Sequence, residues 1–251
     1  MEGDGREVPA PAAAAVMLLC VICAGISFQV LAGNAYLRKA GQFNFFKNTA
    51  QAERYSAKAY AMSPWNEENA YFAGLFAERN GSQEGAIKMF ERAAALNPGH
   101  WEASLNLFNA YTAYNRNEEA LAAALNLYRI SPYSRRAITA AGYMLYINNR
   151  ADDAAEIYER GVRYFPYDYD ILYQASAVFG AAGDTGRVVE YAKRAIEASR
   201  DNSGAYYNLA VAYYKRNELE DAGRVIGVML ERFPDAERFM ALKKAVEDAA
   251  N

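Results

Sequence analysis

The feature that most constrains this chain is the even spacing of its prolines. Five of them keep a period of 34 residues, or twice that length, and these are Pro64, Pro98, Pro132, Pro166 and Pro234. Arg200 occupies the one position in this series where a proline is missing. A fixed period of this length indicates stacked copies of one small structural unit, so the chain is predicted to be a repeat protein.

Placing each proline at position 32 of its repeat divides most of the chain into equal windows. The windows are 33–66, 67–100, 101–134, 135–168, 169–202 and 203–236. Position 20 is small and apolar in each of them: Ala52, Ala86, Ala120, Ala154, Val188 and Ala222. Position 8 is small in all but the third window: Ala40, Gly74, Phe108, Gly142, Ser176 and Ala210. Small residues at fixed positions allow two helices to approach closely.

Each window also carries signals for two helices joined by a tight turn. Position 15 holds residues that adopt the left-handed conformation at low cost, which ends a helix: Gly81, Asn115, Asn149, Gly183 and Asn217. Acidic residues follow, where the helix macrodipole favours negative charge: Glu84, Glu118, Glu119, Asp152, Asp153, Glu220 and Asp221. Helix-capping residues follow the prolines: Asn66, Ser134, Asp168 and Asp235. Each unit is predicted to be helix A, a turn, helix B and a proline stop.

This pattern resembles the tetratricopeptide repeat (TPR) family. The resemblance covers five units over 67–236 and, less closely, a degenerate first unit at 33–66, where Lys47 replaces the Gly or Asn of position 15. The departures from the pattern are Phe108, Leu127, Gly161 and Arg200. At Arg200 the missing proline predicts a longer or looser join to the next unit. The resemblance implies an all-α, right-handed TPR superhelix (an α-solenoid), with residues 237–251 as a solvated capping helix.

A segment without charge, residues 12–32, precedes the first window. Its 21 residues span roughly 30 Å as a helix, which matches the hydrocarbon core of a bilayer. We therefore predict one transmembrane helix after a short polar tail, residues 1–11. The alternative is a signal segment cleaved after Val30-Leu31-Ala32, although the acidic start of the chain is unlike the positive start of a signal peptide.

The side of the membrane follows from the basic residues that flank this segment. Arg6 precedes it, whereas Arg38, Lys39 and Lys47 follow it. The positive-inside rule then places the repeats on the cytoplasmic side of a single-pass membrane protein. If the segment is cleaved instead, the repeats lie on the periplasmic or extracytoplasmic side.

Composition argues against several classes of function. The chain has 27 basic and 30 acidic residues, a net charge of −3 and no basic cluster, so binding to nucleic acid is not expected. Cys20 and Cys23 lie inside the apolar segment, and we interpret them as membrane-buried small residues rather than a redox pair.

Candidate catalytic and metal-binding groups are few. His100 is the single histidine, and it follows Pro98 and Gly99 at a repeat junction, where a surface or capping role is expected. No second histidine or nearby cysteine completes a zinc site or a nucleophilic triad. The glycines of 180–183 are not followed by the Gly-Lys-Ser/Thr of a phosphate loop. We therefore predict no intrinsic catalysis, no cofactor and no metal.

The resemblance to TPR proteins implies a ligand groove, because positions 2, 5, 6, 9 and 12 of helix A face the concave surface in that family. The residues that it assigns to the groove are Tyr71, Phe72, Leu75, Asn106, Asn109, Tyr143, Tyr146, Tyr173, Gln174, Tyr207, Asn208 and Tyr214. Tyrosine supplies contact area with a polar tip, and amides suit the backbone of an extended peptide. Arg136 is the single basic residue at these positions, so a clamp for a C-terminal carboxylate is not expected. The alternative is that these tyrosines pack between neighbouring helices.

Three hypotheses about function follow. The first is a membrane-anchored scaffold that binds a segment of a partner protein, of unknown identity, in the groove. The second is a TPR-bearing C-terminal part or accessory of a glycan-assembling membrane protein, because such repeats resemble those of some O-antigen ligase/polymerase-family proteins, with a glycan in the groove. The third is a periplasmic TPR assembly factor, if the N-terminal segment is cleaved.

Overall fold

The computed structural model describes residues 10–232, 234 and 236–250. This part of the chain forms thirteen helices and contains no strand, which confirms the predicted all-α class. It divides into two compact units, one up to Ala110 and one from Tyr111 onward. The boundary falls near the end of α5 (Trp101–Ala113), and we describe each unit separately.

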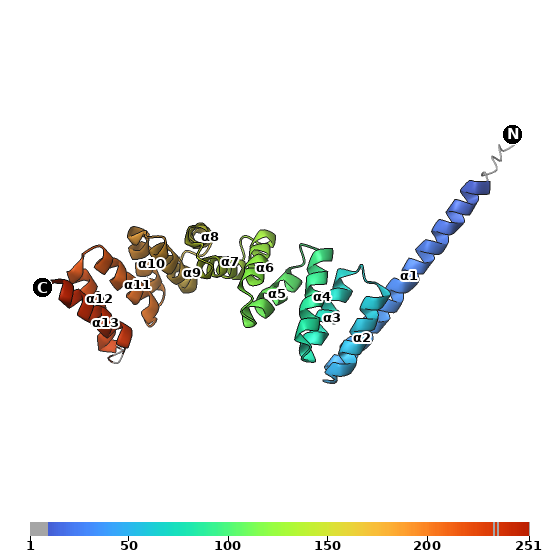
Figure 1. Cartoon of the computed structure of the whole chain (residues 1–251), viewed down its shortest axis with the longest axis horizontal. Coiled ribbons are helices and arrows are strands. Elements are labelled where there is room, and N and C mark those ends of the chain that lie inside the picture. The colour runs from blue at the N-terminus through green and yellow to red at the C-terminus, as the bar shows by residue number, and fades with distance from the viewer. Residues whose placement is uncertain (1–9, 233, 235, 251) are drawn as a thin grey trace. The chain divides into compact units, whose positions relative to one another are not determined.

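The first helix, α1 (Ala10–Phe45), is 36 residues long and contains both the predicted membrane segment and helix A of the first window. Gly33 does not interrupt it. The side chains of residues 14–28 of α1 are exposed, and this part of the helix extends beyond α2 and α3 (Figure 1). Within the described residues, α1 is the one helix long and apolar enough to cross a bilayer, a test that a signal segment also passes.

From α2 to α12 the helices alternate between 14 and 13 residues, and α13 also has 14. In the first unit they are α2 (Thr49–Met62), α3 (Glu67–Arg79) and α4 (Gln83–Leu96). In the second unit they are α6 (Asn117–Ile130), α7 (Arg135–Ile147), α8 (Ala151–Tyr164), α9 (Tyr169–Ala181), α10 (Thr185–Ala198), α11 (Ser203–Lys215), α12 (Leu219–Arg232) and α13 (Glu237–Ala250). Each predicted window thus contains two helices, and the division into six repeats stays our interpretation.

Packing in the second unit follows the order of the chain. Each helix from α6 to α13 contacts the next one, and α7, α9, α11 and α13 also contact one another in sequence. Every second helix therefore shares one face of this unit. This arrangement is that of a solenoid, in which each repeat packs on its neighbours alone.

Turns between helix A and helix B share one backbone conformation. Six described residues have a positive φ, all at position 15: Lys47 (57°), Gly81 (85°), Asn115 (56°), Asn149 (59°), Gly183 (85°) and Asn217 (60°). The helix ends predicted from Gly and Asn are therefore found. Lys47 forms the same turn, although it is not a residue suited to it, so the first unit, degenerate in sequence, keeps the common turn geometry here.

Capping at the start of helix A also follows the prediction. The side chains of Asn66, Ser134 and Asp168 accept hydrogen bonds from backbone N–H groups of the first turn. Asp235 lies outside the described residues. His100 and Asn202 stand at the equivalent position and also accept backbone hydrogen bonds.

The predicted longer or looser join at Arg200 is not found. Residues 199–202 separate α10 from α11, the same four-residue interval that separates α8 from α9 at 165–168. The carbonyl oxygen of Arg200 accepts a hydrogen bond from Arg232 Nη1 at 2.9 Å. The equivalent carbonyl of Pro166 accepts one from Arg194 Nη2 at 3.1 Å. Proline is therefore not needed for this corner to close.

Position 8 of helix A meets position 24 of helix B, and the sizes of the two residues are matched. A Cβ atom at Gly142 would lie 2.5 Å from Tyr158 Cε2, and one at Gly74 would lie 2.7 Å from Phe90 Cδ1. Tyr158 and Phe90 are fully buried. In these two repeats the absent side chain of a glycine makes room for an aromatic ring.

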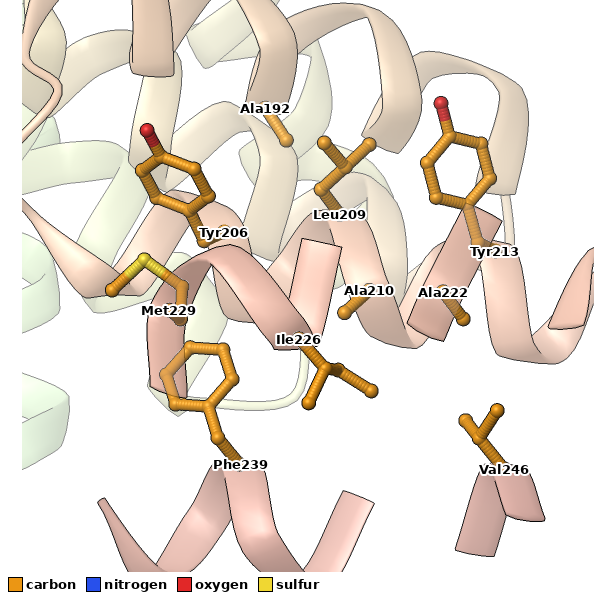
Figure 2. Close-up of a cluster of buried hydrophobic side chains, with 10 residues drawn as sticks. All are labelled: Ala192, Tyr206, Leu209, Ala210, Tyr213, Ala222, Ile226, Met229, Phe239 and Val246. Carbon is orange, nitrogen blue, oxygen red and sulfur yellow. The ribbon is translucent and has the colours of Figure 1, made fainter. Parts of the chain in front are cut away.

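In the last repeat, positions 8 and 24 hold an alanine and an isoleucine instead of a glycine and an aromatic residue. Figure 2 shows Ala210 and Ile226 in the cluster that α11, α12 and α13 form, together with Leu209, Met229 and Phe239. Phe239 of α13 is fully buried there, so the capping helix covers the apolar face of the last repeat. The assignment of residues 237–251 as a solvated end cap stays our interpretation.

The left-handed turn at Lys47 yields a prediction about stability. Lys47→Gly should raise the free energy of unfolding by about 1 kcal/mol, because a non-glycine residue with positive φ is strained. The matched control, Lys88→Gly inside α4, should lower it by about 1 kcal/mol, because glycine is a poor helix former. Urea denaturation of the full chain in detergent, followed by circular dichroism, measures both. Equal effects of the two changes would contradict the assignment.

The matched pair in α7 and α8 yields a second prediction. Gly142→Ala should cost about 1–3 kcal/mol, because the new methyl group overlaps the ring of Tyr158. Combining it with Tyr158→Ile recreates the Ala-Ile pair of the last repeat. The double variant should therefore be more stable than the sum of the two single effects, as a double-mutant cycle measures. Additive effects would mean that the two side chains do not share this space.

Candidate functional site

A hollow of about 290 Å³ opens on the second unit where α7, α9, α10 and α11 meet. Its lining residues are Tyr146, Ser176, Ala177, Gly180, Ala181, Thr185, Val188, Tyr207, Asn208, Val211, Ala212 and Lys215. Three of the four helices are of the A type and share one face of the unit. Residues at positions 5, 6, 9 and 12 of these helices contribute, which are the positions that the TPR resemblance assigns to a ligand.

Small residues on α9 give the hollow its depth. Ala177, Gly180 and Ala181 occupy one side, and Val188 and Val211 complete the apolar part. A Cβ atom at Gly180 would lie 3.6 Å from Val188 Cγ2, an ordinary contact distance. No close neighbour therefore requires a glycine here, in contrast to Gly142. The missing side chain leaves open space instead.

Polar groups stand among the lining residues. Asn208 Nδ2 donates to Ser176 Oγ at 2.8 Å, and that hydroxyl donates to the carbonyl oxygen of Tyr173 at 2.7 Å. This chain of hydrogen bonds holds the amide of Asn208 in one orientation. Within the described residues, no hydrogen bond is formed to Asn208 Oδ1, which is thus available to a ligand as an acceptor.

Lys215 is an exposed residue of the lining, at the C-terminal end of α11. The ammonium group forms no ion pair within the part of the chain that the structure describes. Together with the hydroxyl groups of Tyr146, Tyr207 and Thr185, it adds donors to an otherwise apolar hollow. The arrangement suits an apolar group that is next to a hydrogen-bonding or negatively charged one.

Three of the predicted groove residues, Tyr146, Tyr207 and Asn208, line this hollow. Tyr207 is also in contact with the core, because its ring meets that of Phe239 edge to face with 5.7 Å between the centroids. The other predicted residues of the second unit, Tyr143, Tyr173, Gln174 and Tyr214, are not among the lining residues.

Tyr173 and Tyr214 pack against neighbouring helices. A Cβ atom at Gly204 would lie 2.7 Å from Tyr173 Cε2, so this ring covers the first turn of α11. Tyr173 also stacks on Tyr169 with 5.8 Å between centroids, and burial, followed by the proximity of Tyr173, raises the pKa of Tyr169 to about 12. Tyr214 packs against the cluster of α11–α13. Tyr143 is 44% exposed, outside the hollow.

The remaining predicted residues, Tyr71, Phe72, Leu75, Asn106 and Asn109, belong to the first unit. The ring of Tyr71 lies 4.9 Å from that of His100 between centroids, and the side chain of Asn106 lies close enough to its hydroxyl to act on the pKa. Burial, followed by the Glu102 carboxylate, raises the pKa of Tyr71. Phe72 lines a separate hollow of about 390 Å³ between α1 and α3. Leu75 is half-buried and Asn109 is exposed.

Sequence reasoning missed the polar lining residues Thr185 and Lys215. Thr185 begins helix B, and Lys215 stands one residue beyond position 12 of helix A. A basic residue in the last turn of a helix has an ordinary explanation in the macrodipole, so the sequence did not distinguish it. Lys215 becomes a candidate because the structure places it next to the hollow.

The structure gives His100 a structural role. The side chain is 7% exposed, and Nδ1 accepts a hydrogen bond from the backbone N–H of Ala103 at 3.4 Å. His100 therefore caps α5, which is one of the two expected roles. It is buried, so the other expected role, that of a surface residue, does not apply. Within the described residues, no group of three or more His, Cys, Asp or Glu side chains is placed to hold a metal ion.

A comparison with known protein families agrees with this arrangement of helical pairs. The model named Tetratricopeptide repeat matches residues 77–127 and 181–246. The chain is a tetratricopeptide repeat protein. A TPR repeat-containing protein of Methanocaldococcus jannaschii is 26% identical over 205 residues, which cover 73% of this TPR chain and 35% of that protein. The chain thus spans about a third of the length of this relative.

Solved structures agree on the fold. YrrB, described as a TPR protein with an unusual peptide-binding site, is 17% identical with a TM-score of 0.67, and the match covers 75% of this chain and 97% of YrrB. PilF of Pseudomonas aeruginosa is 14% identical with a TM-score of 0.56, covering 86% and 99%. A structure of Naa15/Naa10 bound to HypK-THB is 16% identical with a TM-score of 0.64, covering 86% and 34%. These likenesses confirm the TPR solenoid fold.

Two helices that border the hollow are joined at their starts by one arginine. Arg135, the first residue of α7, donates to Asp168 at 2.5 and 3.2 Å and to Asp170 at 2.5 Å. Asp168 also caps α9 through the backbone N–H of Ile171. Partial burial alone would raise the pKa of Asp168, but these hydrogen bonds outweigh it, so the pKa lies below its ordinary value.

This clamp predicts a pH-dependent contribution to stability. Asp168→Ala should cost about 1–2 kcal/mol at neutral pH, because a helix cap and an ion pair are lost together. A carboxyl group with a lowered folded-state pKa stabilises the protein above its unfolded pKa of about 4 and loses this effect as pH falls through the folded value. The difference between wild type and variant should therefore shrink below about pH 4. Thermal unfolding across this range measures it, with Asp170→Ala, an exposed partner without a capping role, as the weaker control.

Proposed function

We propose that this TPR protein is a membrane-anchored scaffold that binds a segment of a partner protein in the hollow between α7, α9 and α11. The observation that carries the proposal is the hollow itself, with an apolar interior, an oriented amide at Asn208 and an ammonium group at Lys215 that forms no ion pair among the described residues. Peptide binding is what the description of YrrB states of that protein, and its fold is similar.

The size of the hollow favours one side chain over a whole small molecule. Its volume of about 290 Å³ is at the lower end of the range typical of ligand pockets. An apolar side chain of a peptide fits the surface of Ala177, Gly180 and Val211. Asn208 Oδ1 then accepts a backbone N–H of the peptide, and Lys215 attracts a carboxylate next to the apolar residue. The glycan hypothesis has weaker support: the aromatic lining residues are Tyr146 and Tyr207, and the ring of Tyr207 already packs edge to face on Phe239.

Anchoring by residues 12–32 is the second part of the proposal. The exposed apolar half of α1 has no covering within the described chain, and a bilayer supplies one. The basic residues Arg38 and Lys39 follow it directly, which favours the cytoplasmic side for the repeats. A cleaved segment and a periplasmic location are the alternative. Neither part of the proposal includes a catalytic step.

Filling the hollow tests the binding site. Gly180→Leu places a side chain in the open space, and it should strengthen α9 because leucine is a better helix former than glycine. Peptide display on the full chain in detergent micelles should select peptides with an apolar residue beside an acidic one. Those peptides should bind the Gly180→Leu variant at least about tenfold more weakly, a loss of roughly 1.4 kcal/mol.

Gly223→Leu is the matched control. Gly223 is an exposed helical glycine of α12 in the same unit, no atom lies within 4 Å of its Cβ position, and it is not a lining residue of the hollow. This variant should bind the selected peptides as the wild type does. Unchanged binding to Gly180→Leu, with the fold intact by circular dichroism, would show that the peptides bind elsewhere and would reject the hollow as the site.

A further inference from the structure

The corner between α2 and α3 is packed against α1 at the point where the apolar segment ends. A Cβ atom at Gly33 would lie 3.2 Å from Asn69 Nδ2, 3.4 Å from the carbonyl oxygen of Ala59 and 3.4 Å from Ser63 Oγ. Asn69 is 2% exposed, and its Nδ2 donates to that carbonyl oxygen at 3.2 Å. The corner is therefore held beside residue 33 by close contacts rather than by a loose loop.

This corner exposes a tryptophan. Trp65 follows Ser63 by two residues and is 47% exposed. The adjacent carbonyl oxygen of Pro64 accepts a hydrogen bond from Arg92 Nη2 of α4 at 3.4 Å, which brings a guanidinium group to the same corner. Glu67 and Glu68, in the first turn of α3, follow directly. The corner thus combines one amphipathic ring with charges of both signs.

The other end of the first repeat also exposes aromatic rings, but it lies away from residue 33. Phe45 and Phe46 are 81% and 75% exposed, and their rings meet edge to face with 5.3 Å between centroids. At 1.5 Å per helical residue, Phe45 is about 18 Å further along α1 than Gly33. Of these two exposed aromatic sites, only the corner with Trp65 stands beside the end of the apolar segment.

We propose that Trp65 inserts into the headgroup region of the bilayer that α1 crosses, so that the first repeat contacts the lipid surface at a second point. The inference rests on the proposed membrane anchor. If residues 12–32 span the hydrocarbon core, the position beside Gly33 is the membrane–water interface, where tryptophan is enriched because its ring is apolar and its N–H is polar. Because Glu67 and Glu68 stand at the same corner as the Arg92 guanidinium group, its charges of both signs suit a zwitterionic headgroup.

A second point of contact has a mechanical consequence. The tilt of a membrane helix is set by its packing and by interfacial anchors. A protein held by a single helix without such anchors is therefore free to tilt about the membrane surface. With the corner of α2 and α3 resting on the headgroups, the inclination of the first repeat relative to the membrane is restricted. The restriction reaches α3 and α4 through the buried contacts of Asn69 and the Arg92 hydrogen bond.

Fluorescence quenching in vesicles tests the contact, because the chain has two tryptophans. In Trp101→Phe the remaining tryptophan is Trp65. In Trp101→Phe/Trp65→Phe/Phe46→Trp it stands instead at the distal end, where residue 46 is even more exposed (75% against 47%). Both full-length chains are reconstituted into phosphatidylcholine vesicles that carry bromine near the glycerol end of the acyl chains. We expect the emission of Trp65 to shift to shorter wavelength and to lose more intensity to bromine than that of the distal tryptophan.

Flotation and carbonate extraction of the same vesicles separate the two proposals. If the chain stays in the membrane but bromine quenches Trp65 no more than the distal tryptophan, the corner does not contact lipid and the inference fails while the anchor stands. If carbonate releases the chain, the anchor fails and the inference fails with it. Circular dichroism shows whether the substitutions retain the helical fold, and Trp101→Tyr replaces Trp101→Phe if they do not.

Discussion

The close approach of helix A and helix B in each unit is the constraint on which the rest of the structure depends. Position 20 is buried in all six windows, with exposed fractions of at most 3%: Ala52, Ala86, Ala120, Ala154, Val188 and Ala222. A larger side chain there would push the two helices apart. Because the stability of a solenoid is close to a sum of units and nearest-neighbour interfaces, such a displacement would weaken the adjoining interfaces as well.

The ends of the helices were predictable because local chemistry decides them. Gly and Asn at position 15, acids after them and caps such as Asp168 act within one turn of chain, so no knowledge of distant contacts is needed. At Lys47 and Arg200 the expected Gly or Asn and the expected proline are missing, yet the turn and the corner still form. The turn at Lys47 forms without a suitable residue because α1 and α2 pack around Ala40 and Ala52 with Phe76 of α3. A strain of about 1 kcal/mol is small beside the burial of several apolar side chains.

The candidate site was predictable only in part, because the repeat pattern treats every copy as equal. Positions 5, 6, 9 and 12 of helix A do line the hollow. Tyr173, however, stands at position 5 and instead covers Gly204 of the following repeat. Tyr173 packs because the next repeat offers Gly204 at the point of contact, whereas Tyr214 packs because it meets the cluster of α11–α13. The role of Lys215 could not be predicted for a similar reason, because its ammonium group matters only beside the hollow that α9 leaves open.

Gly180 differs from the tightly packed helical glycines; it shares an uncrowded Cβ position with Gly41, Gly223 and Gly227, but it lines the hollow and they do not. Gly74, Gly142 and Gly204 each face an aromatic ring closer than 3 Å to a Cβ position, so packing explains them. Gly180 has neither a positive φ nor such a neighbour. A glycine inside a helix costs about 1 kcal/mol relative to alanine, and no internal contact offsets that cost at this position. Space for a ligand does explain it: at the same position of α7 and α11 the chain has Tyr146 and Tyr214, and a ring at residue 180 would close the hollow.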